Sequence, residues 1–245
     1  MDPKIQAHLL EINQAFYQQH SMSFSATRQQ VQPGVRQVVQ NILPNASIID
    51  VGCGNGTLSR HLAAHRFSGN YHGIDLSEGL LADARLLLKE SPLGTYTFQK
   101  IDLSETDWAK SIQPKDNDWL VAFAVLHHLP GVDLRKQTVQ VFKELIAPDG
   151  LVAISVWQWH NSSRLRQRVL PWSTIGVDPN AVEDGDVLLD WRAGISPGLR
   201  YVHTFNEVSL SKLAIDTGFE VCETFYSDGK MGNLALYQIW RLVKK

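Results

Sequence analysis

The sequence predicts an α/β domain with a mostly parallel sheet that ends in an antiparallel hairpin. Short apolar runs rich in Ile, Val, Phe and Leu alternate with helical patterns along much of the chain, as in a parallel sheet covered by helices. The last two apolar runs, at 219–225 and 234–242, are joined through a turn at 227–230, so we expect them to pair in opposite directions. No repeat, low-complexity segment or linker divides the 245 residues, which favours a single domain over 1–245.

The elements of this domain follow one another in four parts. We expect a helical cap over 1–45 and a ligand-binding core over 46–157, then an irregular insertion over 158–205 that covers the active edge of the sheet. A C-terminal helix capped by Asn206 and the final hairpin complete the chain over 206–245. The strands of the core are expected at 46–51, 71–76, 95–101, 119–126 and 151–157.

Composition excludes several classes of protein. With 44% hydrophobic and 20% charged residues the chain is neither disordered nor a small disulfide scaffold. Two cysteines, no basic apolar leader and no long apolar run indicate a soluble, reduced, cytoplasmic protein without a membrane segment. The nine histidines show no ligand spacing with acids or cysteines, so no metal site is expected. A net charge of −2 provides no general attraction for nucleic acid, and such a partner would need a local patch.

A glycine-rich loop follows the first predicted strand, with the sequence DVGCGNG at 50–56. Glycines let the backbone approach a ligand there, but Thr57 stands where a dinucleotide fingerprint needs a glycine or alanine. Asp75 ends the second strand, where a carboxylate can accept both hydroxyls of a ribose, and Asp102 ends the third, where an adenine would lie. Open α/β sheets bind ligands at these strand ends, so the pattern favours a nucleoside-like ligand over the alternative that both acids only cap the following helices.

On these residues the chain resembles the class I S-adenosylmethionine-dependent methyltransferases, over 46–157 and the terminal hairpin. The resemblance implies their Rossmann-like fold with seven strands, and S-adenosylmethionine as cofactor. In that family the glycine loop holds the methionine part, the second-strand acid the ribose and the third-strand acid the adenine. The cofactor-binding positions implied here are Asp50, Gly52, Cys53, Gly54, Asp75, Leu76, Asp102 and Leu103, with Val125 near the sulfonium.

A closer resemblance rests on four short motifs in order along the chain, FSATR at 24–28, AVLHH at 124–128, LPW at 170–172 and RYVHTF at 200–205. Together they look like the tRNA wobble-uridine carboxymethyl methyltransferases, which esterify the carboxylate of carboxymethyluridine in the anticodon loop. The resemblance implies the tRNA anticodon loop as a partner. Relatives in eukaryotes and archaea also use a small activator protein at the sheet edge, where we expect Tyr96 and Phe98 to lie unless a helix covers them.

The chemistry implied by this acceptor needs alignment more than proton transfer. A carboxylate is already ionised at pH 7, so no general base is required, and an arginine can orient it with a planar fork of donors. Arg28 and Arg200 are the candidates, with His127 at the pocket mouth; Arg28 could instead hold the carboxylate of the cofactor.

Two features of the sequence leave the acceptor open. In the insertion, Arg164, Arg166 and Arg168 stand among tryptophans and suit an RNA loop, unless they pair with the acidic stretch that follows. The same cofactor loop and arginines would also serve a methyltransferase acting on a small carboxylate or other metabolite. A catalytically silent cofactor-binding subunit is the third alternative.

Overall fold

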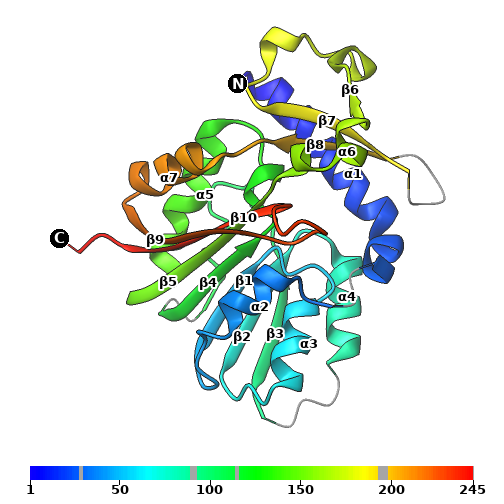
Figure 1. The fold of residues 1–245 in the computed structure, drawn as a ribbon. Helices are drawn as coiled ribbons and strands as arrows, with labels where there is room; N and C mark the ends of the chain where they lie inside the picture. The colour runs from blue at the N-terminus through cyan, green and yellow to red at the C-terminus, as the bar shows by residue number, and fades with distance from the viewer. Residues whose placement is uncertain (28–29, 89–92, 114–115, 193–197, 245) are drawn as a thin grey trace.

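The main sheet has seven strands in the order β3-β2-β1-β4-β5-β10-β9 (Figure 1). A computed structural model describes residues 1–27, 30–88, 93–113, 116–192 and 198–244. The first five strands in this order, β3, β2, β1, β4 and β5, pair in parallel, whereas β10 pairs antiparallel with both β5 and β9. The predicted sheet with its C-terminal hairpin is therefore confirmed. Its strands are β1 (Ser47–Val51), β2 (Asn70–Asp75), β3 (Thr95–Lys100), β4 (Asn117–Phe123), β5 (Ile146–Trp157), β9 (Phe219–Ser227) and β10 (Ala235–Leu242).

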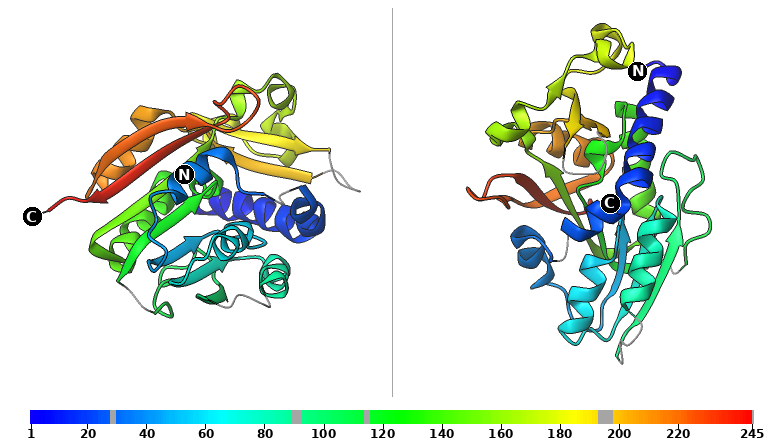
Figure 2. Two further views of the ribbon diagram at one scale, coloured as in Figure 1. Left: turned by 60° about the horizontal axis from the view of Figure 1, so that its bottom comes forward. Right: turned by 90° about the vertical axis from the view of Figure 1, so that its right-hand side faces the viewer.

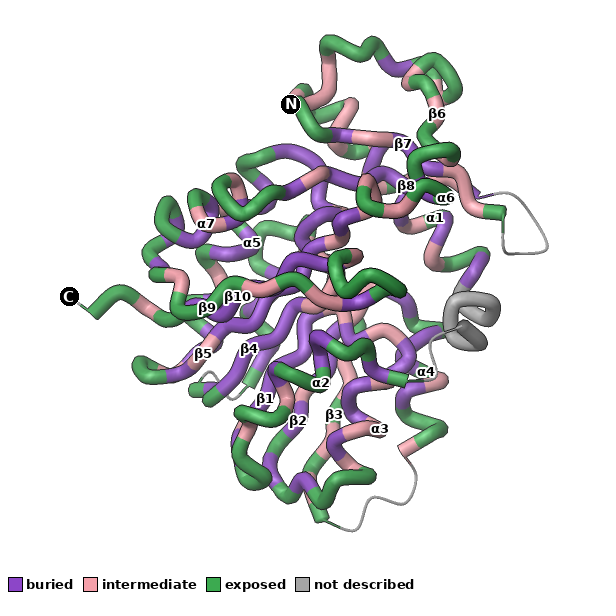
Figure 3. The backbone as a smooth tube through the Cα atoms, in the orientation of Figure 1, coloured by how far each residue is buried: buried purple, intermediate pink, exposed green. Residues whose placement is uncertain are grey.

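Helices cover both faces of this sheet and bury its centre (Figure 3). On one face α2 (Pro33–Val39) and α3 (Thr57–Ala64) pack in a core with Ile48 and Trp119. On the other face α5 (Val132–Leu145) and α7 (Glu207–Asp216) pack in a second core. The helix α4 (Glu78–Leu87) begins after Ser77, whose side chain accepts a hydrogen bond from the Leu80 N–H at 3.4 Å.

The N-terminal helix and the insertion lie together at one end of the main sheet (Figure 2). The helix α1 (Pro3–Thr27) runs alongside β8 of a second, antiparallel sheet. That sheet consists of β6 (Val169–Leu170), β7 (Asp186–Trp191) and β8 (Gly198–His203). No helix of the part of the chain that the structure describes is long and apolar enough to cross a membrane.

The insertion is more regular than the sequence predicts. Its β7 and β8 pair with Leu188 opposite Tyr201, both fully buried, so the segment has a small core of its own. Prolines interrupt its sequence, but Pro171 and Pro179 begin short turns, η3 (Trp172–Ile175) and η4 (Pro179–Ala181), outside the strands. Three further short elements complete the chain, namely η1 (Leu126–His128), η2 (Trp159–Asn161) and α6 (Ser163–Arg166).

Candidate active site

The glycine loop turns at the carboxyl end of β1 and has the backbone that only glycine adopts readily. Gly52, Gly54 and Gly56 have φ values of 73°, 56° and 72°. The N–H groups of Gly52 and Cys53 both donate to the Ile74 carbonyl, at 2.8 and 3.0 Å, which fixes the loop to the end of β2. A Cβ built at Gly54 would meet nothing within 4 Å, so the loop borders open space that a ligand can enter.

Asp75 binds this loop through its side chain. One carboxylate oxygen accepts the Gly54 N–H at 2.9 Å and the other accepts the Ser77 N–H at 2.8 Å. Burial raises the pKa of the Asp75 carboxyl, although the hydrogen bonds from Ser77 and Gly54 lower it in part. Because each carboxylate oxygen has two lone pairs, both can still accept ribose hydroxyls as the sequence predicts. The loop and Asp75 thus fit the methionine and ribose parts of S-adenosylmethionine.

Asp50 lies beneath the loop, buried at the end of β1. The hydroxyl of Tyr71, on β2, donates a hydrogen bond to its carboxylate. Burial raises the pKa of Asp50 to about 7, the Tyr71 hydrogen bond lowers it, and the negative charge of Asp75 raises it. Burial also raises the pKa of the neighbouring Cys53 thiol, which keeps that group neutral and excludes it as a nucleophile.

Side chains from the segments that follow β2, β3 and β4 complete the wall. A Cβ at Gly52 would lie 2.5 Å from Val125 Cγ2, so the predicted sulfonium neighbour touches the loop directly. Leu76, Leu103 and Val125 are each half-buried. Asp102 is half-buried as well, and it accepts hydrogen bonds from the Ser104 N–H and hydroxyl at 2.9 and 2.6 Å within a local turn. Its contact with adenine stays a prediction.

The two histidines after β4 have different surroundings. His127 is buried, and its Nδ1 accepts the Trp157 N–H at 3.3 Å, which places the ring proton on Nε2. His128 bridges the cap and the insertion, because its ring nitrogens contact the Tyr17 hydroxyl at 2.8 Å and the Tyr201 carbonyl at 3.2 Å. His128 therefore holds elements together, whereas His127 packs beside Trp157 at the end of β5.

Arg200 lies on β8, only 3% exposed, in a cage of aromatic rings. Its guanidinium carbon is 4.8 Å from the ring centres of Phe16 and Trp191 and 4.9 Å from that of Trp157. Since Trp157 ends β5 and also holds His127, the structure brings Arg200 and His127 to the same part of the active edge. The third candidate, Arg28, lies outside the described residues.

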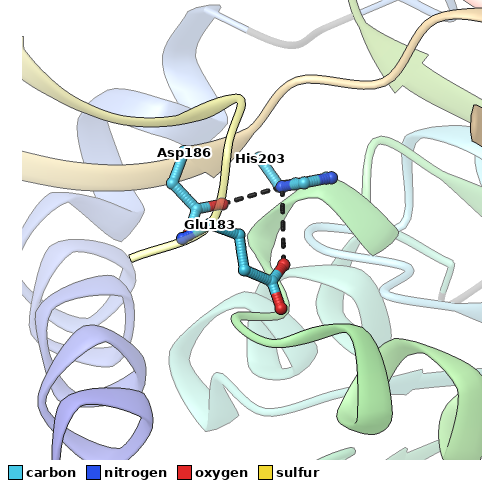
Figure 4. Close-up of side chains that lie close together, drawn as sticks. All are labelled: Glu183, Asp186 and His203. Atoms are coloured by element: carbon cyan, nitrogen blue, oxygen red, sulfur yellow. Dashed lines mark hydrogen bonds and ion pairs between the residues drawn. The ribbon is translucent and has the colours of Figure 1, made fainter. Parts of the chain in front are cut away.

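The acidic stretch of the insertion is engaged in its own network (Figure 4). His203 Nδ1 lies 2.7 Å from Asp186 Oδ1 and 3.9 Å from Glu183 Oε2, and these three residues are close enough to hold a metal ion. Their ligand atoms are already used, however. Glu183 pairs with the buried Arg135, and the Tyr201 hydroxyl donates to Asp186 at 2.7 Å. This network connects the second sheet to α5, and its hydrogen bonds and ion pairs indicate a structural role rather than a metal site.

Two expectations about surface groups have mixed outcomes. The strand β3 is an edge strand, as predicted. Tyr96 and Phe98 are half-buried, and their ring centres lie 5.7 and 5.9 Å from that of Tyr71, so the rings are partly covered and the docking of a partner at this edge stays a prediction. Their alternation in sequence directs both rings to the face that α3 covers.

Several residues that shape the site escaped the sequence analysis. The buried Asn13 side chain donates to the His128 carbonyl at 3.0 Å and accepts the Tyr201 N–H at 2.9 Å, which fixes α1 to β8. Arg60 supports the glycine loop from behind, through hydrogen bonds to the Asn55 carbonyl and the Thr57 hydroxyl. An asparagine on an amphipathic helix carries no distinctive spacing, so only tertiary structure reveals its role.

Comparisons with known proteins agree with this geometry. Residues 49–152 match a family described as a methyltransferase domain. The chain is 27% identical over 209 residues to a candidate methyltransferase of Encephalitozoon cuniculi, covering 85% of this chain and 87% of that protein. It is 32% identical over 113 residues to a ubiquinone biosynthesis O-methyltransferase of Azoarcus sp. (46% of this chain, 45% of that protein). It is 26% identical over 134 residues to a tRNA (carboxymethyluridine(34)-5-O)-methyltransferase of Arabidopsis thaliana (55% and 30%).

Solved structures show the same fold. A methyltransferase from Methanosarcina mazei that depends on S-adenosylmethionine superposes with a TM-score of 0.65 at 20% identity, over 88% of this chain and all of that one. The magnesium protoporphyrin IX methyltransferase of Synechocystis, with bound S-adenosylhomocysteine, gives a TM-score of 0.56 at 20% identity, over 95% and 86%. The predicted fold of the core is confirmed, and the methyltransferase-domain match over 49–152 agrees with S-adenosylmethionine as its cofactor. The acceptors named for the relatives differ.

Proposed function

We propose that this protein transfers a methyl group to the carboxylate of carboxymethyluridine at the wobble position of tRNA, forming a methyl ester. When bound, S-adenosylmethionine supplies the methyl group on a cationic sulfonium. The observation that carries the choice of a carboxylate acceptor is the caged guanidinium of Arg200 beside His127 at the active edge.

Arg200 suits the task of orienting a carboxylate without changing its charge. Aromatic rings hold a cation through their negative faces, while the N–H groups of a guanidinium point outward in its plane toward oxygen acceptors. The acceptor is ionised at neutral pH, so one oxygen can be held by the arginine while the other attacks the methyl group in line. His127, buried against Trp157, would help to exclude water from the reacting atoms.

The arginines of the insertion support an RNA acceptor. Arg164 and Arg166 are exposed on α6, and no ion pair among the described residues joins Arg164, Arg166 or Arg168 to the acidic stretch. Instead Glu183 forms an ion pair with Arg135, and Asp186 contacts His203. The arginines can therefore contact phosphates of the anticodon loop. Arg28, as a ligand of substrate or cofactor, and a small activator protein at the β3 edge remain parts of this proposal.

One observation favours a second candidate, a methyltransferase acting on a small carboxylate or other metabolite. Arg200 is almost inaccessible, which suits a small ligand closed in by the cap and insertion better than a nucleotide on a stem-loop. Relatives named for ubiquinone biosynthesis are consistent with it. A silent cofactor-binding subunit would bind the cofactor and yield no methylated product.

Nucleoside mass spectrometry separates these candidates. Purified protein is incubated with S-adenosylmethionine and tRNA that carries carboxymethyluridine, and the wobble nucleoside is then measured. We expect the methyl ester with wild-type protein, and Arg200→Lys, which keeps the charge but loses the fork, to lower kcat by about tenfold or more. The control Arg192→Lys changes an exposed arginine paired with Asp190 and should retain activity. Unmethylated wobble uridine with a protein that binds cofactor would exclude the tRNA acceptor.

A further inference from the structure

Positive charge is concentrated in one stretch of the chain. Residues 12–74 contain four arginines and four histidines, and their single acidic residue is Asp50. Asp50 is buried beneath the glycine loop, so it does not offset these charges at the surface. This stretch has a formal charge of +3 (four Arg minus one Asp), and with a total of −2 the rest of the chain has −5. The near-neutral total therefore conceals a basic region.

Four of these basic side chains meet in one groove between α2 and α3. Arg36, Arg60, His61 and His65 line a surface cavity of about 430 Å³ together with Gln30 and Thr57. A second hollow of about 290 Å³ adjoins it and shares Arg36, His61 and His65. We name the two hollows together the α2–α3 groove. Its far end is apolar, lined by side chains that include Val39, Ile42 and Phe67.

The groove gathers like charges with little internal compensation. The rings of His61 and His65 lie 4.2 Å apart, and burial together with the charges of His65 and Arg36 lowers the pKa of His61. No ion pair among the described residues includes Arg36, His61 or His65. Burial lowers the pKa of Arg60 and the charge of Asp83 on α4 raises it in part, and Arg60 is also held by the glycine loop. A bound anion would relieve this repulsion.

We propose that the α2–α3 groove binds the phosphate backbone of the tRNA substrate, an inference that rests on the function proposed above. Arg36, His61 and His65 would contact phosphates, and the apolar end would accept a ribose or an unstacked base. Two adjoining hollows that share Arg36, His61 and His65 suit a polymer of repeated phosphates better than a single small anion. Through Thr57, which lines the groove and hydrogen-bonds Arg60, the bound backbone would lie next to the helix that follows the glycine loop.

Fluorescence anisotropy with a labelled RNA stem-loop that carries carboxymethyluridine tests the groove. We expect Arg36→Glu with His65→Glu to weaken binding by about tenfold or more, and to reduce the slope of log K against log salt by about one per lost phosphate contact. The gentler pair Arg36→Gln with His65→Gln should show a smaller change in the same direction. Both side chains are exposed, so folding should be retained.

The control is Lys143→Glu, which reverses the charge of an exposed lysine of α5, on the opposite face of the sheet, as Arg36→Glu does in the groove. It should bind the stem-loop like the wild type, and all variants should bind S-adenosylmethionine equally in calorimetry. RNA binding that is absent in the wild type, or identical in the groove variants and the control, would overturn the groove proposal. RNA binding that depends on the groove, with no methyl ester formed, would instead reject the tRNA acceptor.

Discussion

At the scale of single residues, Asp50 shows how burial sets the chemistry of a carboxyl group. Its ordinary pKa of 3.8 rises to about 7 in the folded protein, so the folded state keeps a proton that the unfolded state loses. Stability conferred by this group therefore falls as pH rises from about 4 to about 7. Asp50→Asn removes that dependence, and its free energy of unfolding relative to wild type should increase by up to about 4 kcal/mol between those pH values.

Urea denaturation at a series of pH values measures this difference. Tyr71→Phe is the companion variant, because loss of the Tyr71 hydrogen bond removes a group that lowers the pKa of Asp50. In Tyr71→Phe the pH range in which stability falls should therefore extend upward. A difference between wild type and Asp50→Asn that does not change with pH would contradict the burial of this carboxyl.

Gly54 and Gly56 form a matched pair of positions in the same loop. Both have positive φ, so alanine strains either backbone by roughly 1 kcal/mol. A Cβ at Gly56 would lie 2.8 Å from that of Ala84, whereas one at Gly54 would enter open space. We expect Gly54→Ala to lower cofactor affinity about tenfold or more, with little loss of stability beyond the backbone strain. We expect Gly56→Ala to lower stability by about 1 to 3 kcal/mol more than the backbone strain alone.

Calorimetric titration with S-adenosylhomocysteine and urea denaturation test the two positions side by side. Gly54→Ala that binds the ligand as tightly as wild type would show that the open space beside the loop is not the place of the cofactor.

At the scale of elements, Glu183 joins the second sheet to α5. Burial of the carboxyl raises its pKa, but the hydrogen bond and charge of Arg135, with the Val132 N–H and the charge of His203, together lower it below its ordinary 4.5. The stabilisation is present above that value and is lost as pH falls through the folded pKa. Glu183→Gln leaves the Arg135 charge buried and should cost about 3 kcal/mol at pH 7, with a smaller difference at low pH.

Glu220→Gln is the control for this pair, since Glu220 and Arg241 form an ion pair that is about half exposed. Its cost should be about 1 kcal/mol or less. Equal losses in the two variants, measured by urea denaturation, would show that the Glu183 network does not hold the insertion in place.

Elements of the main sheet were predictable because their signals are local. The glycine loop, Asp75 at the end of β2, and the Ser77 and Asn206 caps each follow from a few adjacent residues. The second sheet was not predictable, since β7 and β8 are short and surrounded by prolines and acids. Their pairing depends on contacts such as those of Asn13, which lies 188 residues from Tyr201 in sequence. Such long-range contacts leave no periodic pattern.

At the scale of the whole molecule, the charge distribution matters more than its sum. The insertion arginines and the α2–α3 groove lie on different parts of the surface, while Glu183 and Asp186 of the acidic stretch are engaged with Arg135 and His203. Net charge alone excluded general attraction to nucleic acid, and it could not reveal this separation. Two basic surfaces on one protein would orient an RNA as well as attract it.

The cofactor site joins the ends of β1, β2 and β4 through the loop, Asp75 and Val125, so ligand binding should stabilise the molecule as a unit. A ligand present at about 100 times its Kd raises the free energy of unfolding by about 2.7 kcal/mol. For a domain of this size that corresponds to a rise in Tm of roughly 5 to 10 °C.

Asp75→Ala should lose most of this shift with S-adenosylhomocysteine, because both oxygens that would accept ribose hydroxyls are removed. Differential scanning fluorimetry with Asp149→Ala, at an exposed acid far from the loop, provides the control. Equal shifts in both variants would show that Asp75 only fastens the loop and does not bind the cofactor.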